Sequence, residues 1–442
     1  MSTELEIITP RQVTDLGQES ADIEDATARN IRAHQLAPID GGLAAWRLLF
    51  TAFVFEALLW GFPLSFGVFQ EYYSRVPEFS GNRYISVVGT VASGLGYLGA
   101  PIIMPVIQRY PRQQRVLIWV GWPICIIGLV SGSFATTLEM LILSQGVAYG
   151  LGFLIFYYPI VNMLNEYWVA RRGMAYGILC GASGVSGCIM PFVLEALLST
   201  YGHQTTLRAV AVALTLLTGP LIPFLKGRLP LPERGSVPNV NWNFLHNSLF
   251  WIYSVSNILQ GFAYFYPSLY LPSYASSLGL SGREGALLLA LMSVTQVVGQ
   301  FVFGSLSDSK VPLDILACLS TVAAAVASFA IWRQAESLSV LIVFALIYGF
   351  FAAGFTAIWV RMSTAITDDA TAGPIVFSSL NFGKGIGNVL AGPIGGFLVS
   401  TPNLMDTLAS YDLVIIFTGV CMFASALTIL LGSLRHVHVT LR

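Results

Sequence analysis

Twelve long apolar runs limit this chain to very few folds. About twenty apolar residues are enough for a helix to cross the hydrocarbon core of a bilayer. The runs are continuous, whereas outer-membrane barrels show ten-residue segments of alternating hydrophobicity. The composition agrees, because 55% of the residues are hydrophobic and only 10% are charged, against about 25% charged in soluble domains. The sequence therefore predicts an all-α polytopic membrane protein with twelve transmembrane helices, at 46–69, 84–107, 116–136, 138–163, 174–199, 207–225, 246–271, 285–306, 312–332, 338–360, 374–400 and 411–434.

Charges in the connecting loops predict the direction of these helices. Of the 22 lysines and arginines, two lie inside apolar runs, fifteen lie on the side of both chain ends, and five lie on the other side: Arg75, Arg83, Arg208, Arg283 and Arg333. Lysine and arginine accumulate in cytoplasmic loops, so both termini are predicted to be cytoplasmic. The cell membrane is the default expectation for the location. Residues 1–39 are polar without an apolar segment, which predicts a disordered tail and not a cleaved signal peptide.

A hydrophilic segment between the sixth and seventh runs divides the chain into two halves. The fifth and eleventh runs repeat a glycine pattern, with glycines at 181, 184 and 187 in one and at 383, 385 and 387 in the other. Two repeated six-helix halves are typical of transporters that rock one half against the other around a site at the bilayer midplane. The expected organisation is an N-terminal six-helix bundle over 40–226, a cytoplasmic linker over 227–243, a C-terminal six-helix bundle over 244–434 and a cytoplasmic tail over 435–442.

Four short motifs resemble a known family. D-G-G-L-A-A-W, with Asp40, Gly41, Gly42 and Trp46, precedes the first run, and E-Y-W-V-A-R-R-G-M-A-Y-G at 166–177 leads into the fifth. Together they resemble the two signatures of the monocarboxylate-porter family of the major facilitator superfamily. The first motif, with S-F-G-V-F-Q-E-Y-Y at 65–73, resembles the fungal branch of that family, and G-S-L-S-D at 304–308 matches a loop motif of the superfamily. The resemblance implies two six-helix bundles that work by alternating access.

The chain departs from the family at the residues that carry lactate. Animal members that move lactate with a proton have an aspartate and an arginine four residues apart in the eighth span, where this chain has Gln296 and Gln300. Those members also have a lysine after the proline of the first span, where this chain has Leu64. Because glutamine cannot titrate, proton-coupled transport through this pair is not expected.

Two charged residues lie at membrane depth and are the leading candidates for a site. Glu56 is ten residues into the first run and Lys384 is ten residues into the eleventh, which places both about 15 Å from the cytoplasmic end. We expect them to face a central cavity, either paired with each other or addressing substrate and proton. A pair that only neutralises itself within the bundle is the alternative.

Further polar and aromatic residues fall inside the runs. Asn381, Lys384 and Asn388 share one helix face, and Asn257 and Gln260 lie one turn apart in the seventh run, as do Gln296 and Gln300 in the eighth. Polar side chains at this depth need partners, so they face either the cavity or a neighbouring helix. Tyr264 lies beside Asn257 and Gln260 in the seventh run and is a further candidate. Aromatic residues that could stack on a flat substrate, or simply pack, are Tyr157, Tyr158, Phe262, Phe265 and Tyr348.

Charged residues at the cytoplasmic helix ends form a separate group: Arg171, Arg172, Asp308 and Arg361. In the superfamily, such charges latch the two halves together in the outward-open state. The alternative is that they only determine topology.

The expected function is secondary active transport of a small organic molecule. Export of a secondary metabolite fits the fungal branch, and uptake of a monocarboxylate or a vitamin-like nutrient is the alternative. A transporter-shaped receptor and a membrane enzyme are rivals from other classes; the sequence contains no nucleophile–base arrangement, no nucleotide-binding motif and no metal-ligand spacing. We therefore expect no cofactor, no metal and no nucleic-acid partner. The expected partners are a small-molecule substrate, the lipid bilayer and a coupling proton, with the protein monomeric.

Overall fold

The computed structural model describes residues 37–169, 171–228, 242–307, 309, 311–369, 372–400 and 409–440. Residues 1–36 of the predicted tail, residues 229–241 of the predicted linker and Asp308 lie outside the described residues. Throughout the described part the regular structure is helical, without any strand, as the apolar runs predict.

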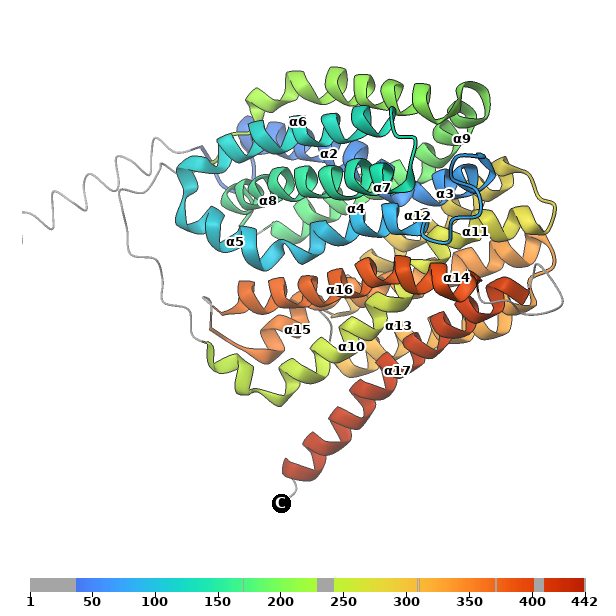
Figure 1. The fold of residues 1–442 in the computed structure, drawn as a ribbon. Helices are drawn as coiled ribbons and strands as arrows, with labels where there is room; N and C mark the ends of the chain where they lie inside the picture. Colours follow the sequence, from blue (N-terminus) through green and yellow to red (C-terminus); the bar gives the residue numbers. More distant parts are fainter. Residues whose placement is uncertain are drawn as a thin grey trace, which may run out of the picture.

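The N-terminal half comprises the helices before the segment 229–241 (blue to green in Figure 1). Its elements are α2 (Gly42–Leu64), α3 (Phe66–Arg75), α4 (Ser86–Leu98), α5 (Ala100–Arg109), the short η1 (Pro111–Gln113), α6 (Gln114–Gly132), α7 (Leu138–Leu141), the π-helix η2 (Ile142–Ala148), α8 (Tyr149–Tyr167), α9 (Arg172–Thr218) and η3 (Gly219–Phe224).

The C-terminal half comprises the helices after that segment (yellow to red in Figure 1). Its elements are η4 (Trp242–His246), α10 (Ser248–Tyr264), α11 (Tyr266–Ser277), α12 (Gly282–Ser307), α13 (Leu313–Val326), the π-helix η5 (Ala327–Ile331), η6 (Trp332–Gln334), α14 (Leu338–Ala357), α15 (Trp359–Ile366), α16 (Gly373–Ser400) and α17 (Ala409–Thr440).

These elements form twelve crossings within the described residues, in the order predicted. Eight helical stretches are long and apolar enough on their own, or nine when the bent pair of α4 and α5 counts as one crossing. The remaining three crossings are not counted separately by length and hydropathy, each for a different reason. One helical stretch, α9, covers two crossings; α10 and α11 are two short pieces of one crossing; and α16 carries the polar residues Asn381, Lys384 and Asn388.

The first crossing of each half is a broken helix. The first crossing bends at Ser65, just after Pro63, and the seventh bends at Phe265, two residues before Pro267. Proline lacks an N–H and its ring clashes with the preceding turn, which is enough to kink a helix. The matching positions of these two breaks support the relation between the halves that the glycine pattern indicates.

One helix boundary agrees with the prediction and one differs from it. The label α9 covers two helices, the fifth and sixth crossings, which a kink at Gly202 separates as the predicted runs 174–199 and 207–225 require; the φ of 76° at Gly202 is accessible to glycine at little cost. The helix α17 continues to Thr440, beyond the expected end of the last run at 434. No glycine or proline after Gly432 ends it, and Figure 1 shows this helix projecting from the bundle.

The two halves meet mainly along three helix pairs, α3 with α11, α4 with α16, and α9 with α12, and α5 also contacts α16. Glycine makes the contacts of α4 with α16 and of α9 with α12 close, because a Cβ at Gly94 would lie 2.3 Å from Val389 and one at Gly187 would lie 2.4 Å from Ser293. Ser86 also donates a hydrogen bond to the carbonyl of Gly392, at 2.9 Å. The bond from Ser86 to Gly392 lies towards the predicted outer end, whereas the two close glycine contacts lie near the middle of their predicted crossings.

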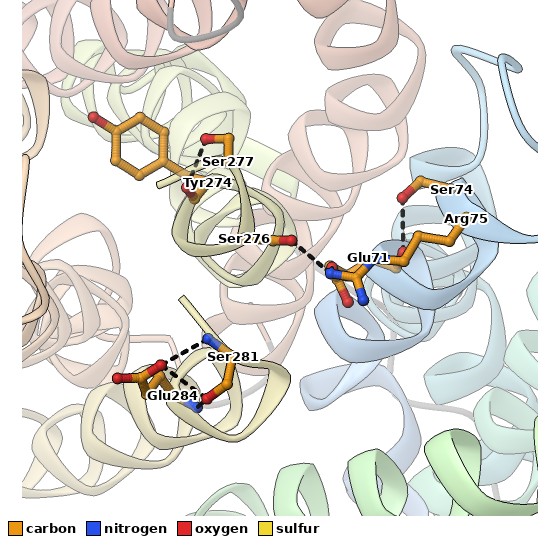
Figure 2. A network of polar contacts seen from close by, with 8 residues as sticks. All are labelled: Glu71, Ser74, Arg75, Tyr274, Ser276, Ser277, Ser281 and Glu284. Carbon is orange, nitrogen blue, oxygen red and sulfur yellow. Dashed lines mark hydrogen bonds and ion pairs between the residues drawn. The ribbon is translucent and has the colours of Figure 1, made fainter. Parts of the chain in front are cut away.

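A polar tie crosses between the halves at the same predicted outer end (Figure 2). Arg75 of α3 forms an ion pair with Glu71 on its own helix and donates a hydrogen bond to Ser276 of α11, at 2.6 Å. Nearby, Ser281 and Glu284 form a capping box at the start of α12, in which the Ser281 backbone N–H donates to the Glu284 carboxylate at 2.6 Å. The bonds from Arg75 to Ser276 and from Ser86 to Gly392 thus hold the halves together at the predicted outer end.

Candidate functional site

The carboxyl group of Glu56 is buried within the N-terminal half. Glu56 belongs to α2, and the residue is only 8% exposed. Trp60, one helical turn further along, donates a hydrogen bond to it. The second carboxylate oxygen, Oε2, has no protein partner among the described residues. A carboxylate without a cation is expensive to bury, so this position is suited to taking up and releasing a proton.

The ammonium group of Lys384, in the C-terminal half, is surrounded by aromatic rings. The residue is 1% exposed, and its Nζ lies 3.5 Å from the ring centroid of Tyr264, 5.3 Å from that of Trp359 and 5.7 Å from that of Tyr97. We call these three rings the lysine cage. Cation–π contacts contribute about 0.5–2 kcal/mol, less than the several kcal/mol that burying an ammonium costs. The lysine cage therefore offsets only part of the cost.

Glu56 and Lys384 do not form an ion pair; the described ion pairs involve neither residue. Of the two arrangements considered from the sequence, direct pairing is thus not the one seen in this structure. The two groups are connected instead through aromatic rings. The ring of Trp60 packs against that of Tyr97 at 5.9 Å between centroids, and Tyr97 belongs to the lysine cage.

Two more rings extend this aromatic surface on α8. Trp60 contacts Phe153 edge to face at 5.0 Å, and Phe153 stacks on Tyr157 at 5.1 Å with 14° between the ring planes. We call Trp60, Tyr97, Phe153 and Tyr157 the aromatic wall. Three of its members are only half-buried, so part of each ring surface remains uncovered by protein. The aromatic wall comes from three helices of the N-terminal half, and α10, α15 and α16 supply the rest of the site.

Three of the six amides predicted near the site donate to backbone carbonyls. Asn257 donates to Leu380 at 2.5 Å, Gln260 donates to Ala352 at 3.2 Å, and Asn381 donates to Phe377 on its own helix at 2.9 Å. The first two bonds join neighbouring helices, which is the alternative considered for these residues. The amide oxygens of Asn257 and Gln260 nevertheless have no partner within the described structure.

Asn388 differs from the other amides. It is fully buried one turn beyond Lys384, and neither its amide nitrogen nor its oxygen has a partner in the part of the chain that the structure describes. On α12, Gln296 is buried and Gln300 is half-buried. Among the predicted aromatics, Tyr348 is fully buried and donates to the carbonyl of Ala263, and Phe265 is also buried, so both pack in the core.

The two signature motifs contact each other at the predicted cytoplasmic end. The carboxylate of Asp40 accepts hydrogen bonds from the backbone N–H groups of Val169, at 2.9 Å, and Arg171, at 2.7 Å. Trp46 packs edge to face on Trp168, with 5.2 Å between centroids. We call this contact the signature clasp. Gly41 and Gly42 follow Asp40 directly at the start of α2, where Gly42 has a φ of 83°.

A second set of contacts ties the start of the predicted linker to the signature clasp. The carboxylate of Glu166 accepts from the backbone N–H of Arg228 at 2.8 Å, and the Arg228 side chain donates to the carbonyl of Ala37 at 2.7 Å. Arg361 is exposed on α15. The latch between halves proposed for Arg171, Arg172, Asp308 and Arg361 remains a prediction, since Asp308 lies outside the described residues; the contacts named here are all within the N-terminal half.

Sequence reasoning missed four residues of the site: Trp60, Tyr97, Phe153 and Trp359. Only Trp60 had a usable signal, because residues four apart share a helix face and Trp60 follows Glu56 by four. The other three are brought to the site by packing between helices that are far apart in the chain. The described residues contain no group of three or more histidine, cysteine or acidic side chains arranged to hold a metal.

Comparisons with known proteins agree on one family. The sequence model of the Major Facilitator Superfamily matches residues 48–331 and 253–440. The fujikurins efflux protein of Gibberella fujikuroi is 27% identical over 412 residues, which cover 91% of this chain and 85% of that protein. Monocarboxylate transporter 13 of Rattus norvegicus is 25% identical over 399 residues, covering 89% and 90%.

A solved structure shares the fold. The crystal structure of a POT family transporter in complex with 5-aminolevulinic acid superimposes with a TM-score of 0.72 at 14% sequence identity, covering 91% of this chain and 99% of that one. This similarity confirms the predicted twelve-helix architecture.

Proposed function

The chain belongs to the Major Facilitator Superfamily and is a multi-pass secondary transporter of a small molecule, not an enzyme, and from that premise we propose that it exports a secondary metabolite. We place it in the fungal branch of the monocarboxylate porters, in the cell membrane, as a monomer with both termini cytoplasmic. Its motifs, its loop charges and its similarity to a fungal efflux protein support this proposal.

One observation carries the proposal: each half buries one ionisable side chain that has no ion-pair partner among the described residues, and aromatic rings connect these two side chains. Ionisable groups inside a membrane bundle mark substrate and ion pathways. Trp60, next to Glu56, contacts Tyr97, and Tyr97 in turn contacts Lys384. These contacts lie at the interface that must open and close during alternating access. A relative movement of the two halves would change the surroundings of both charges at once.

Coupling to a proton follows from the chemistry of Glu56. A buried carboxyl group with an unpartnered oxygen is most stable when it carries a proton, and it loses that proton more easily when water reaches it. We therefore assign the coupling proton to Glu56 and the substrate contacts to the aromatic wall and Lys384. Inward proton movement would then drive outward movement of the metabolite.

Closure at one end also fits this mechanism. The hydrogen bond from Ser86 to the carbonyl of Gly392 and the tie from Arg75 to Ser276 both lie at the predicted outer end. With the predicted orientation, this arrangement corresponds to a conformation that faces the cytoplasm, in which an exporter collects its substrate. Release outside would require these contacts to separate.

Uptake of a monocarboxylate or a vitamin-like nutrient is the second candidate. The similarity to rat monocarboxylate transporter 13 along most of both chains favours it, with Lys384 in place of the missing cationic residues. Accumulation of labelled organic acids and aromatic metabolites, measured in yeast cells with and without the protein, separates the two directions. Export predicts lower steady-state accumulation in expressing cells; higher accumulation would contradict export, and unchanged accumulation of every compound would contradict transport of these classes.

A further inference from the structure

The site has a chemical preference that goes beyond the class of secondary metabolite. We infer that the substrate is a planar aromatic or conjugated compound with one acidic group, whose anion binds Lys384 and whose ring system lies against the aromatic wall. The inference rests on the proposed transport function and deepens it. It assigns ligand contacts to Lys384, Asn388 and the aromatic wall.

The lack of a counter-ion for Lys384 indicates that the substrate carries an anionic group. Its ammonium is almost completely buried, and within the described residues it has aromatic neighbours but no carboxylate. Aromatic faces attract a cation without neutralising it. A carboxylate, an enolate or a phenolate placed at Nζ would supply the missing charge with a strong hydrogen bond.

A hydrogen-bonding group next to the anion follows from Asn388. This side chain follows Lys384 by four residues on α16 and therefore lies on the same helix face. It is completely buried with neither amide atom partnered in the described structure. Buried polar groups are nearly always satisfied, so a ligand that reaches Lys384 is expected to use this amide as well.

The planar part of the ligand follows from the aromatic wall. Its rings contact one another in sequence from Trp60 to Tyr157, and three of them retain uncovered surface. Aromatic pairs favour stacked and edge-to-face arrangements, so an extended flat molecule gains contacts that a small aliphatic acid cannot make. The arrangement therefore discriminates in two ways: Lys384 disfavours cations and the aromatic wall disfavours compounds the size of lactate.

Calorimetric titration of the purified full-length protein in lipid nanodiscs tests this inference with three probes. They are 2-naphthoate, its neutral analogue 2-naphthamide, and lactate. We expect naphthoate to bind at least about tenfold more tightly than naphthamide, and lactate to show no measurable heat. This comparison needs no variant, so it does not depend on how a substitution folds.

Two variants assign the contacts. Lys384→Gln is expected to reduce naphthoate affinity to that of naphthamide and to leave naphthamide unchanged, whereas Tyr157→Leu is expected to weaken both ring probes to a similar degree. Lys226→Gln, at an exposed position after η3, is the matched control and should bind like the unmodified protein. Equal affinities for naphthoate and naphthamide, an unaffected Lys384→Gln variant, or lactate binding as tight as naphthoate would each overturn the inference.

Flux measured in proteoliposomes separates this inference from the proposed function. If the protein moves a neutral or cationic metabolite and does not bind naphthoate, the substrate class is wrong and the transport function stands. If naphthoate binds in a Lys384-dependent way but no tested aromatic acid crosses the membrane, the ligand class stands and the proposed export is wrong.

Discussion

Replacing Lys384 with methionine is expected to stabilise the protein while abolishing transport. The lysine is 1% exposed and has only the lysine cage around its ammonium among the described residues. Methionine is unbranched, similar in length and apolar, so it fills the same space without a charge. The native residue is therefore retained at the expense of stability, as is common where function requires a charge.

The size of the effect follows from two opposing terms. Burying an ammonium without a counter-ion costs several kcal/mol after relaxation, and the cation–π contacts of the lysine cage return about 0.5–2 kcal/mol. The difference predicts a gain of about 2 kcal/mol for Lys384→Met. For a chain of this length, that corresponds to an increase of about 2–5 °C in the melting temperature.

The assay is thermal unfolding of both proteins in the same detergent at one scan rate, followed by substrate flux in proteoliposomes. Lys226→Met is the matched control because Lys226 is exposed, and its stability should change by no more than about 0.5 kcal/mol. A clear decrease in the melting temperature of Lys384→Met would refute the reasoning, because it would mean that the ammonium has a partner stronger than the cost of its burial.

Two further substitutions test contacts elsewhere in the fold. Asp40→Ala removes two hydrogen bonds that the carboxylate accepts in the signature clasp, so it should lower the free energy of unfolding by about 2 kcal/mol. Asp40→Asn keeps an accepting oxygen, so its free energy of unfolding should fall by less in the same denaturation experiment. Equal decreases in both variants would argue against these bonds. Gly187→Ala places a Cβ 2.4 Å from Ser293, whereas Gly181→Ala meets nothing within 4 Å. Only Gly187→Ala should lengthen the distance between a spin label near the turn at Gly202 of α9 and one near the start of α12. An identical distance in both variants would contradict the close packing.

The bilayer made most of the fold predictable. Its thickness fixes the length of an apolar helix, so the runs show where the chain crosses, and loop arginines suggest the direction. Pro63 and Pro267 are visible in the sequence, but whether they bend a helix or end it depends on neighbouring helices. The extension of α17 past the membrane was missed because hydropathy reports where apolar residues stop and not where hydrogen-bonded turns stop.

The sequence pointed to the two charges of the site and to some of their neighbours, among them Tyr157, Tyr264 and Asn388, but not to the arrangement of the rings. Glu56 and Lys384 are conspicuous because a charge among apolar residues needs a reason. The lysine cage was not predictable, since Tyr97, Tyr264 and Trp359 come from three helices whose rotation depends on the packing of both halves. For the same reason the sequence could not distinguish Asn257, whose amide bonds a neighbouring helix, from Asn388, whose amide has no partner in the described residues.

The most direct test of the account is proton movement coupled to substrate in proteoliposomes. A pH-sensitive dye in the lumen would report protons that cross when an exported metabolite is added, in the unmodified protein, in Glu56→Gln and in the control Glu139→Gln, whose residue lies in the first turn of α7 near the predicted outer end. The account predicts a substrate-dependent proton flux that Glu56→Gln abolishes and Glu139→Gln retains. An undiminished proton flux in Glu56→Gln would contradict the assignment of the coupling proton to the buried carboxyl group of the first crossing.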